Sequence, residues 1–298
     1  MEQIAITFLG TGNAVPTKLR NHTAILVSFA NENILIDCGE GTQRQFKIAE
    51  ISPTKLTKLL ITHWHGDHIL GIPGLLQTLS MSEYQKNLEI YGPRGTKNYM
   101  HLLQELFREF HIKTKIEEVS GKVAETPLSL IEAMPMAHGT PTNGYSIVLK
   151  DRTRLDKSKL RKLNLPNSPI LKELQEGRDI IVNGKKIKAS QISYTEKGKK
   201  VTIILDTGMT DNAVKLAKDS DLLICEATFS DEEQEKAAEY KHLTAAQAAT
   251  IAKKAKAKRL ILTHISQRYE HNLSVIEKEA KKIFKNTQIV KDFDIITI

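Results

Sequence analysis

The sequence predicts an α/β fold, in which buried strands alternate with helices. Its first support is a set of short apolar, β-branched runs such as residues 201–205, each stopped by a polar or glycine turn. The second is helical spacing between such runs, as in residues 96–107 and 245–257. The third is a cluster of ligand-type side chains directly after the apolar run at residues 59–61. Sheets of this class bind ligands at the carboxyl ends of their strands, where this cluster falls.

The cluster after residues 59–61 consists of His63, His65, Asp67 and His68. Imidazole nitrogens and a carboxylate suit zinc or a similar divalent ion. In an extended backbone the alternate residues His63 and His65 point the same way, whereas Asp67 and His68 lie on the turn and point elsewhere. One cluster can therefore serve two metal ions. A chance polar loop would account for one histidine but poorly for four ligand-type side chains together.

This His-x-His-x-Asp-His pattern after a hydrophobic strand resembles the metallo-β-lactamase superfamily. The segments GTGNAVPTKLRNHTAIL, DCGEGTQRQ and THISQRY are similar to the ribonuclease Z family, and the resemblance extends along the whole chain. It implies an αββα sandwich, two packed sheets with helices outside, formed by residues 1–298 as one domain. It also implies a zinc-dependent endoribonuclease that cleaves the 3′ trailer from precursor tRNA.

The bulk properties are compatible with such a protein but do not identify it. The 298 residues carry a net charge of +8, which favours a polyanionic partner without choosing between RNA, DNA and a membrane. Two cysteines, Cys38 and Cys225, are too few for a disulfide scaffold and favour a reducing compartment. The amino terminus lacks a basic signal segment, and the apolar runs fall short of the roughly 18 residues of a membrane span. We therefore expect a cytoplasmic protein without a membrane partner.

The amino-terminal part of the chain is expected to form three strands, at residues 3–9, 23–29 and 33–37, the last two joined as a hairpin. Asp37 then opens a turn that leads into a helix. By resemblance to the family, Asp37 supports the metal ligands without being a principal ligand itself. Such support is physically reasonable because ligating imidazoles need an oriented partner.

The loop PTKLRN lies between the first two strands. Composition alone favours a solvated basic loop. The resemblance implies instead that Lys18, Arg20 and Asn21 contact the 3′ end of the RNA near the cleaved bond. It likewise implies that Arg268, four residues after His264, contacts the scissile phosphate.

The middle of the chain leads to another candidate ligand. His138 follows an apolar run and precedes a glycine, and alone it would be an ordinary histidine. In chain order it matches the family's third motif. The elements expected here are helices at 69–79 and 96–107 and strands at 89–91, 115–119 and 128–134.

Residues 150–200 differ in composition from the rest of the chain. They hold fifteen lysines and arginines against six acidic residues, a net charge of +9. Charge runs of this kind are usually solvated surface, with short helices here at 157–163 and 170–175. In position the insertion, at about 152–195, resembles the flexible arm by which the family holds tRNA, often across a dimer. Family arms commonly carry a Gly-Pro pair where this chain has Asn167-Ser168-Pro169.

Further candidate residues follow the strands of the carboxyl-terminal part. Asp206 leaves the strand at 201–205 and, taken alone, favours a helix cap, whereas in the family this position bridges two metals. Cys225, at the end of the strand at 221–225, stands where the family commonly has histidine, and it either packs quietly or perturbs the surroundings of the ligands. His264 follows the strand at 259–262.

His242 precedes a helix at 245–257 for which Thr244 is a suitable N-cap. Taken alone it is a surface residue, and the family resemblance makes it the general acid. A helix at 273–284 and strands at 288–290 and 293–298 close the chain.

The resemblance assigns roles to the whole set of candidates. It implies two zinc ions per subunit, with other divalent ions as alternatives, in a homodimer that binds precursor tRNA. Asp67 would also act as general base. The first zinc takes His63, His65 and His138, the second takes Asp67, His68 and His264, and Asp206 bridges the two.

Three other functions are alternatives to a tRNA-cleaving endoribonuclease. A superfamily hydrolase of a thioester, lactone or small phosphodiester would use the same metals, but it would not need a basic insertion. A non-catalytic RNA-binding protein is disfavoured because buried carboxylates and imidazoles are costly without metal. A redox di-iron protein is disfavoured because such relatives commonly have Glu where His65 stands.

Overall fold

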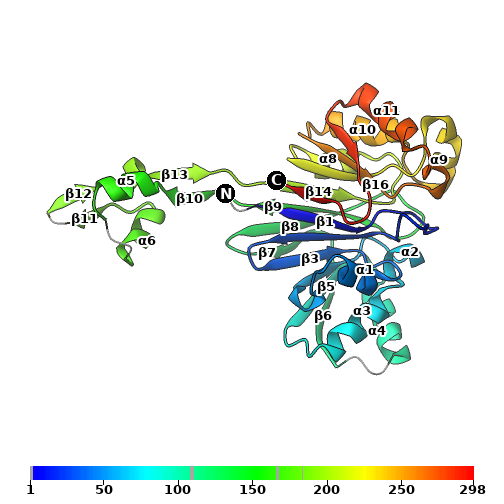
Figure 1. Ribbon diagram of the computed structural model, residues 1–298, viewed down its shortest axis with the longest axis horizontal. Coiled ribbons are helices and arrows are strands. Elements are labelled where there is room, and N and C mark those ends of the chain that lie inside the picture. The colour runs from blue at the N-terminus through cyan, green and yellow to red at the C-terminus, as the bar shows by residue number, and fades with distance from the viewer. Residues whose placement is uncertain (1–2, 108–110, 166–167, 183) are drawn as a thin grey trace.

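The computed structural model describes residues 3–107, 111–165, 168–182 and 184–298. Two seven-stranded sheets pack face to face, and helices cover both outer surfaces (Figure 1). The first sheet has the order β18-β1-β2-β3-β4-β5-β6, with β3 to β6 parallel. Its strands are β1 (Ala5–Gly10), β2 (Ala24–Phe29), β3 (Glu32–Ile36), β4 (Lys58–Leu60), β5 (Asn87–Gly92), β6 (Lys113–Glu118) and β18 (Ile295–Thr297).

The second sheet has the order β17-β16-β15-β14-β9-β8-β7, with β14 to β17 parallel. Because β8 and β14 are both antiparallel to β9, they run in the same direction. The carboxyl ends of β8, β14, β15 and β16 therefore lie at one edge. The strands are β7 (Gly121–Glu125), β8 (Ser129–Pro135), β9 (Asn143–Leu149), β14 (Lys200–Ile204), β15 (Leu222–Glu226), β16 (Leu260–Thr263) and β17 (Thr287–Ile289).

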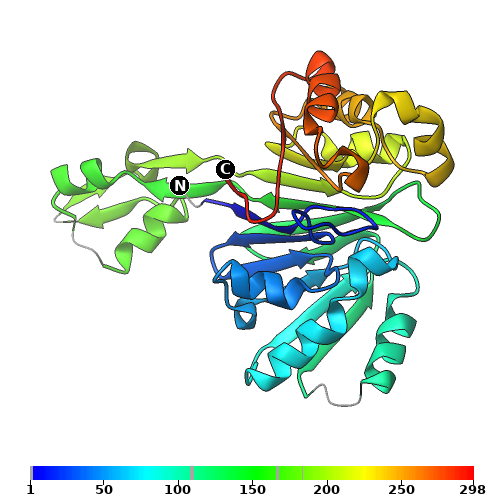
Figure 2. The ribbon, with the colours of Figure 1, turned by 45° about the vertical axis from the view of Figure 1, so that its right-hand side comes forward.

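Helices cover each sheet on the face that points away from the other sheet (Figures 1 and 2). The first sheet carries α1 (Thr42–Ile48), α3 (Ile72–Met81) and α4 (Thr96–Leu106), and the second carries α8 (Asp211–Ala217), α10 (Ala245–Lys254) and α11 (Leu273–Ile283). Shorter helices lie in the connections: α2 (Gly66–Ile69), α9 (Gln234–Tyr240) and the 3₁₀ turns Pro53–Lys55, Asp231–Glu233 and Gln267–Tyr269.

Three apolar clusters hold these layers together. Residues such as Phe8, Tyr145 and Ile224 are buried between the two sheets. Phe46 joins the helices of the first sheet to its outer face, and Ile251 does the same for the second sheet. Alternation along each strand explains the arrangement, because successive side chains point to opposite faces and both faces are covered.

Between β9 and β14 the chain leaves the sandwich and forms a projecting segment, residues 152–196 (Figure 1, left). β10 and β13 pair as its stem, and Leu174, Ile187 and Ile192 are among the residues of a small separate core. Its elements are β10 (Arg152–Leu155), α5 (Lys157–Lys162), α6 (Ile170–Gln175), β11 (Ile180–Val182), β12 (Lys185–Ile187), α7 (Ala189–Ile192) and β13 (Ser193–Glu196).

The predicted α/β class and αββα sandwich are confirmed. Several expectations differ in detail. The helix expected at 69–79 is α3, which begins at Ile72, because Ile69 ends the separate short helix α2. The strands β7 and β9 of the second sheet were not expected. In the parts of the chain that the structure describes, no helix is both long and apolar enough to cross a membrane.

Candidate metal centre

Seven predicted ligands converge where the carboxyl ends of strands from both sheets meet. His63, His65, Asp67 and His68 follow β4 of the first sheet, and His138, Asp206 and His264 follow β8, β14 and β16 of the second. They can be grouped as two sets of potential metal ligands that share Asp206. The site lies at the end of the sandwich opposite the projecting segment, because β9 runs from one to the other (Figure 1).

The first set is His63, His65, His138 and Asp206. Nδ1 of His65 lies 3.1 Å from Nε2 of His63 and 3.2 Å from Nε2 of His138. Oδ2 of Asp206 is 3.5 Å from Nε2 of His63 and 4.0 Å from Nε2 of His138. Ligands of a tetrahedral zinc lie roughly 3.3 Å from one another, given bonds of about 2.0–2.1 Å. The ring nitrogens therefore have the spacing of a coordination shell.

The second set is Asp67, His68, His264 and Asp206. The Nε2 atoms of His68 and His264 are 3.2 Å apart. Oδ2 of Asp67 lies 3.3 Å from the first of these and 3.4 Å from the second. Oδ1 of Asp206 lies 3.2 Å from Nε2 of His264, while its Oδ2 lies 3.5 Å from Nε2 of His63 and also 3.5 Å from Nε2 of His68. The carboxylate of Asp206 therefore lies between the two sets, and its bridging role stays a prediction.

The second ring nitrogen of several histidines is held by a partner outside the two sets. Oδ2 of Asp37 lies 2.6 Å from Nδ1 of His68 and accepts from the hydroxyl of Thr62, which is 3.0 Å from Nδ1 of His63. Thr228 Oγ1 lies 2.9 Å from Nδ1 of His264. Such partners fix the tautomer and the direction of each ring. Asp37 lies where the resemblance implied, beside the ligands, and its role stays a prediction.

The electrostatics of the cluster suit a cation. Burial opposes ionisation of Asp206, but His264, His68 and His63 together hold the pKa of this carboxyl well below its ordinary value. Burial and neighbouring imidazoles lower the pKa of His63, which favours the neutral form that a ligand needs. Within the described residues, Oδ1 of Asp206 is buried and accepts no hydrogen bond. A divalent ion would satisfy this oxygen, so the residues present fit a metal.

A carboxylate that sequence reasoning missed completes the site. Glu226 ends β15 and is fully buried, and its carboxylate lies 3.0 Å from Nδ1 of His242. It also accepts from Thr207 N at 2.7 Å and from Thr228 Oγ1 at 2.6 Å. Burial disfavours the charged form of His242, but Glu226 outweighs this effect and raises the pKa of His242 to about 9. Glu226 could have been found from the sequence, because it stands at the end of an apolar run as the candidate ligands do.

The predicted RNA-contact residues differ in accessibility. Lys18 is exposed and Asn21 partly exposed. Arg20 is only 4% exposed, and its Nη1 donates to Thr11 Oγ1 and to the Val290 carbonyl. Its guanidinium is therefore engaged inside the protein, and the RNA contact implied by the resemblance stays a prediction. Arg268 lies on the surface, pairs with Glu233 and sits over the Phe229 ring at 5.4 Å.

Two alternatives considered for single residues are resolved by position. Asp206 does not cap a helix, because the N-cap of the following helix α8 is Thr210. Cys225 is fully buried among the apolar residues beneath α8 and α10, so it packs as an apolar side chain of this cluster. Of Asn167-Ser168-Pro169 in the insertion, Asn167 lies outside the described residues.

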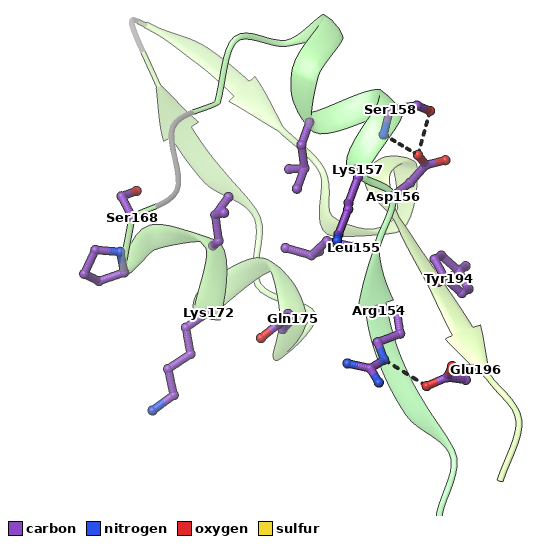
Figure 3. Close-up of a pocket in the computed structure, with 13 residues that line it drawn as sticks. Arg154, Leu155, Asp156, Lys157, Ser158, Ser168, Lys172, Gln175, Tyr194 and Glu196 are labelled. Carbon is purple, nitrogen blue, oxygen red and sulfur yellow. Dashed lines mark hydrogen bonds and ion pairs between the residues drawn. The ribbon is translucent and has the colours of Figure 1, made fainter. Parts of the chain in front are cut away.

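A cleft of about 1070 Å³ lies far from the ligands, on the projecting segment between its stem and α6. Lys157 and Lys172 line it together with Tyr194 (Figure 3). At the stem, Arg152 and Arg154 both bond Glu196, which ties β10 to β13.

Similarity to known proteins agrees with this geometry. Residues 178–265 match a family model described as "Beta-lactamase superfamily domain", and residues 4–153 match one described as "Anti-Pycsar protein Apyc1". A metallo-β-lactamase fold protein of Bacillus subtilis superposes with a TM-score of 0.72 over 100% of both chains at 19% identity, which shows the fold. The fold and its divalent-metal site thus define a metal-dependent hydrolase of the metallo-β-lactamase fold.

Proteins with higher sequence identity show to which family within this class the chain belongs. Ribonuclease Z of Methanosarcina acetivorans is 36% identical over 97% of this chain and 96% of its own length. Ribonuclease Z of Listeria monocytogenes is 40% identical over 98% and 99%. The short form of human tRNase Z has a TM-score of 0.71 at 28% identity and covers 98% of both chains. The chain belongs to the ribonuclease Z family and is a metal-dependent endoribonuclease.

Proposed function

We propose that this protein cleaves the 3′ trailer from precursor tRNA with two zinc ions per subunit, in the cytoplasm. The tRNA would keep a 3′ hydroxyl and the trailer a 5′ phosphate. The observation that carries the proposal is the two overlapping ligand sets, which occur in a chain 36–40% identical to ribonuclease Z proteins over almost its whole length.

The donor atoms favour zinc over a harder ion. Each set offers imidazole nitrogens together with carboxylate oxygen, which is the ligand mixture of zinc sites. His63, His65 and His138 would hold one ion, and Asp67, His68 and His264 the other. Asp206 would bridge them. Two such ions, when bound, lower the pKa of a water and neutralise the charge that develops on the phosphate.

The chain's own side chains would then handle the protons. Oδ2 of Asp67 faces His68 and His264, which leaves Oδ1 to orient the attacking water and accept its proton. His242 is held through Nδ1 by Glu226, so its Nε2, 3.9 Å from Oδ2 of Asp206, faces the site. The Glu226 carboxylate raises the pKa of His242, which favours its protonated form. His242 would give its proton to the departing 3′ oxygen.

Contacts made by residues other than the metal ligands would select tRNA. Lys18, Asn21 and Arg268 would hold the RNA beside the cleaved bond. The projecting segment would make sequence-independent phosphate contacts through side chains such as Lys157 and Lys172, which suits an enzyme that accepts many tRNAs. The segment and the ligands lie at opposite ends of β9, an arrangement that favours a homodimer in which one subunit holds a tRNA that its partner cleaves.

The test is to incubate the protein with a 3′-extended precursor tRNA and map both product ends. We expect one cut, a 3′ hydroxyl on the tRNA and a 5′ phosphate on the trailer, with about two zinc ions per chain by elemental analysis. Asp67→Ala, which removes a ligand and the base together, serves as the inactive control. Absence of a stoichiometric divalent metal in every preparation would contradict the proposal.

A further inference from the structure

A buried polar network holds the loop that carries Lys18, and the proposed chemistry gives this network no role. Arg20 Nη1 donates to Thr11 Oγ1 at 2.6 Å and to the Val290 carbonyl at 2.7 Å. The Thr11 hydroxyl donates in turn to Oδ1 of Asp292, also at 2.6 Å. Hydrogen bonds to charged groups in such a shielded place are strong, and a partner left unpaired there is costly.

The main chain of Arg20 closes the turn at the tip of the loop, next to this network. Thr17 N donates to the Arg20 carbonyl at 2.8 Å, and Arg20 N donates to Thr17 Oγ1 at 3.0 Å. Oδ2 of Asp292 accepts from Asn21 N at 2.7 Å. Lys18 is exposed at the tip of this turn. Tilting the turn would break the bonds of the Arg20 side chain or the bond from Asn21 N to Asp292, so these contacts hold the backbone beneath Lys18.

Both ends of the loop are attached to the segments that carry metal ligands. Thr11 O accepts from Ile265 N at 3.2 Å, directly after His264. At the other end, His22 packs so closely on Gly39 that a Cβ there would lie 2.4 Å from His22 Cβ and 2.6 Å from the Asp67 carbonyl. The position of the turn is therefore set relative to two of the proposed ligands, His264 and Asp67.

We propose that Arg20 and Asp292 are positioning residues that fix the Lys18 turn relative to the metal ligands and thereby select which phosphodiester bond of the RNA is cut. The inference rests on the proposed function, since it takes precursor tRNA as substrate. A lysine on a loose loop would accept the RNA backbone in several registers. A lysine on an anchored turn presents one phosphate-binding point at one distance from the attacking water.

The experiment compares Arg20→Met and Asp292→Asn with Arg259→Met. Arg259 is the control, because its Nη2 bonds the Gln288 side chain on β17, two residues before Val290, rather than an atom of the loop. Each variant is assayed for metal content, hydrolysis of bis(p-nitrophenyl) phosphate, kcat/KM on precursor tRNA and the position of the cut. A cycle combining Arg20→Met with Lys18→Ala measures whether the two residues act together.

For Arg20→Met and Asp292→Asn we expect kcat/KM on precursor tRNA to fall about 10–100-fold, with cuts at neighbouring bonds, because misplacement by about an ångström has such a cost. Metal content and hydrolysis of the small phosphodiester should match those of Arg259→Met. In protein that already carries Arg20→Met, adding Lys18→Ala should lower kcat/KM on precursor tRNA only slightly further. Equal loss on both substrates, an unchanged cut with unchanged kcat/KM, or full additivity with Lys18→Ala would overturn the inference. Wild-type protein that cuts no precursor tRNA would instead refute the proposed function.

Discussion

Single residues of the site sit where a strand ends in an unusual backbone conformation. Asp37, Asp206 and His264 have positive φ angles of 57°, 43° and 57°. Residues other than glycine rarely adopt this region, and each instance costs about 1–3 kcal/mol. The surrounding sheets hold these conformations in place. At these three positions the turn places two proposed ligands and the partner of His68 at the proposed metal centre.

His242 is the residue whose role can be separated most cleanly from metal binding. His242→Ala should keep the metal content and tRNA affinity, yet lose about 10²–10⁴-fold in rate, the usual worth of a positioned acid. The loss should shrink on a nitrophenyl phosphodiester, because a nitrophenolate leaves without a proton. Single-turnover rates on both substrates measure the effect.

The control for this variant is His101→Ala, which removes an exposed histidine of α4 and should change nothing. Glu226→Gln keeps His242 in place but removes the charge that favours its protonated form, so we expect a smaller loss than for His242→Ala. If His242→Ala loses metal, then His242 is a ligand, as its place in a third group with Glu226 and His264 would allow.

The sequence reveals a site residue when its neighbours along the chain form a recognisable pattern, and it hides one whose contacts are distant in the chain. The seven candidate ligands follow apolar runs, so strand-end reasoning located their segments and the family resemblance assigned their roles. Glu226 follows a strand in the same way, but its partner His242 comes sixteen residues later and gave no local sign. Arg20 looked like a solvated loop residue, because its acceptor at Val290 is 270 residues away. Burial produced by such distant contacts cannot be read from a local pattern.

At the scale of elements, the projecting segment is a folded unit of its own. Leu174 of α6 packs with Ile180 of β11 and Ile187 of β12, so removing α5 and α6 alone would leave the rest without a core. A cleaner deletion follows the stem. Leu155 of β10 pairs with Ser193 of β13, so residues 156–192 can be replaced by an Asn-Gly turn.

This shortened protein should bind tRNA much more weakly while hydrolysing bis(p-nitrophenyl) phosphate at a near-normal rate. The slope of log K against log salt should decrease by about 0.7–0.9 for each phosphate contact removed. Titrations at several salt concentrations measure it. The double variant Lys157→Gln and Lys172→Gln tests whether the positive charge of the segment is needed for tRNA binding, and it leaves the core of the segment intact. Equal loss on the small phosphodiester would mean that the segment supports the sandwich.

Some elements of the projecting segment were predicted and others were not, and the difference has a physical reason. Helix α6 has its expected bounds of Ile170–Gln175, since its apolar residues have helical spacing. The stem strands β10 and β13 were not expected, because Arg152, Arg154 and Glu196 give them little apolar character. They are held by pairing and by these charges rather than by burial. Such strands carry no hydrophobic signal in the sequence.

At the scale of the whole molecule, the proposed metal site joins the two sheets. Four candidate ligands follow β4 of the first sheet, and His138, Asp206 and His264 follow strands of the second. A bound ion would therefore link the two halves of the sandwich across their open edge. Since the unfolded chain has no such site, metal binding should add directly to the free energy of unfolding.

Removing the metal should accordingly lower the melting temperature. At a free metal concentration a hundredfold above Kd, each ion contributes about 2.7 kcal/mol, which corresponds to about 4 °C for a chain of this size. Thermal unfolding followed by circular dichroism, with and without a chelator, measures the shift. Asp206→Ala should melt lower and lose most of its response to the chelator, because Asp206 is shared by both sets. Asp211→Asn, an exposed acid on α8, should respond like the wild type. A chelator effect unchanged in Asp206→Ala would place the stabilising metal elsewhere in the protein.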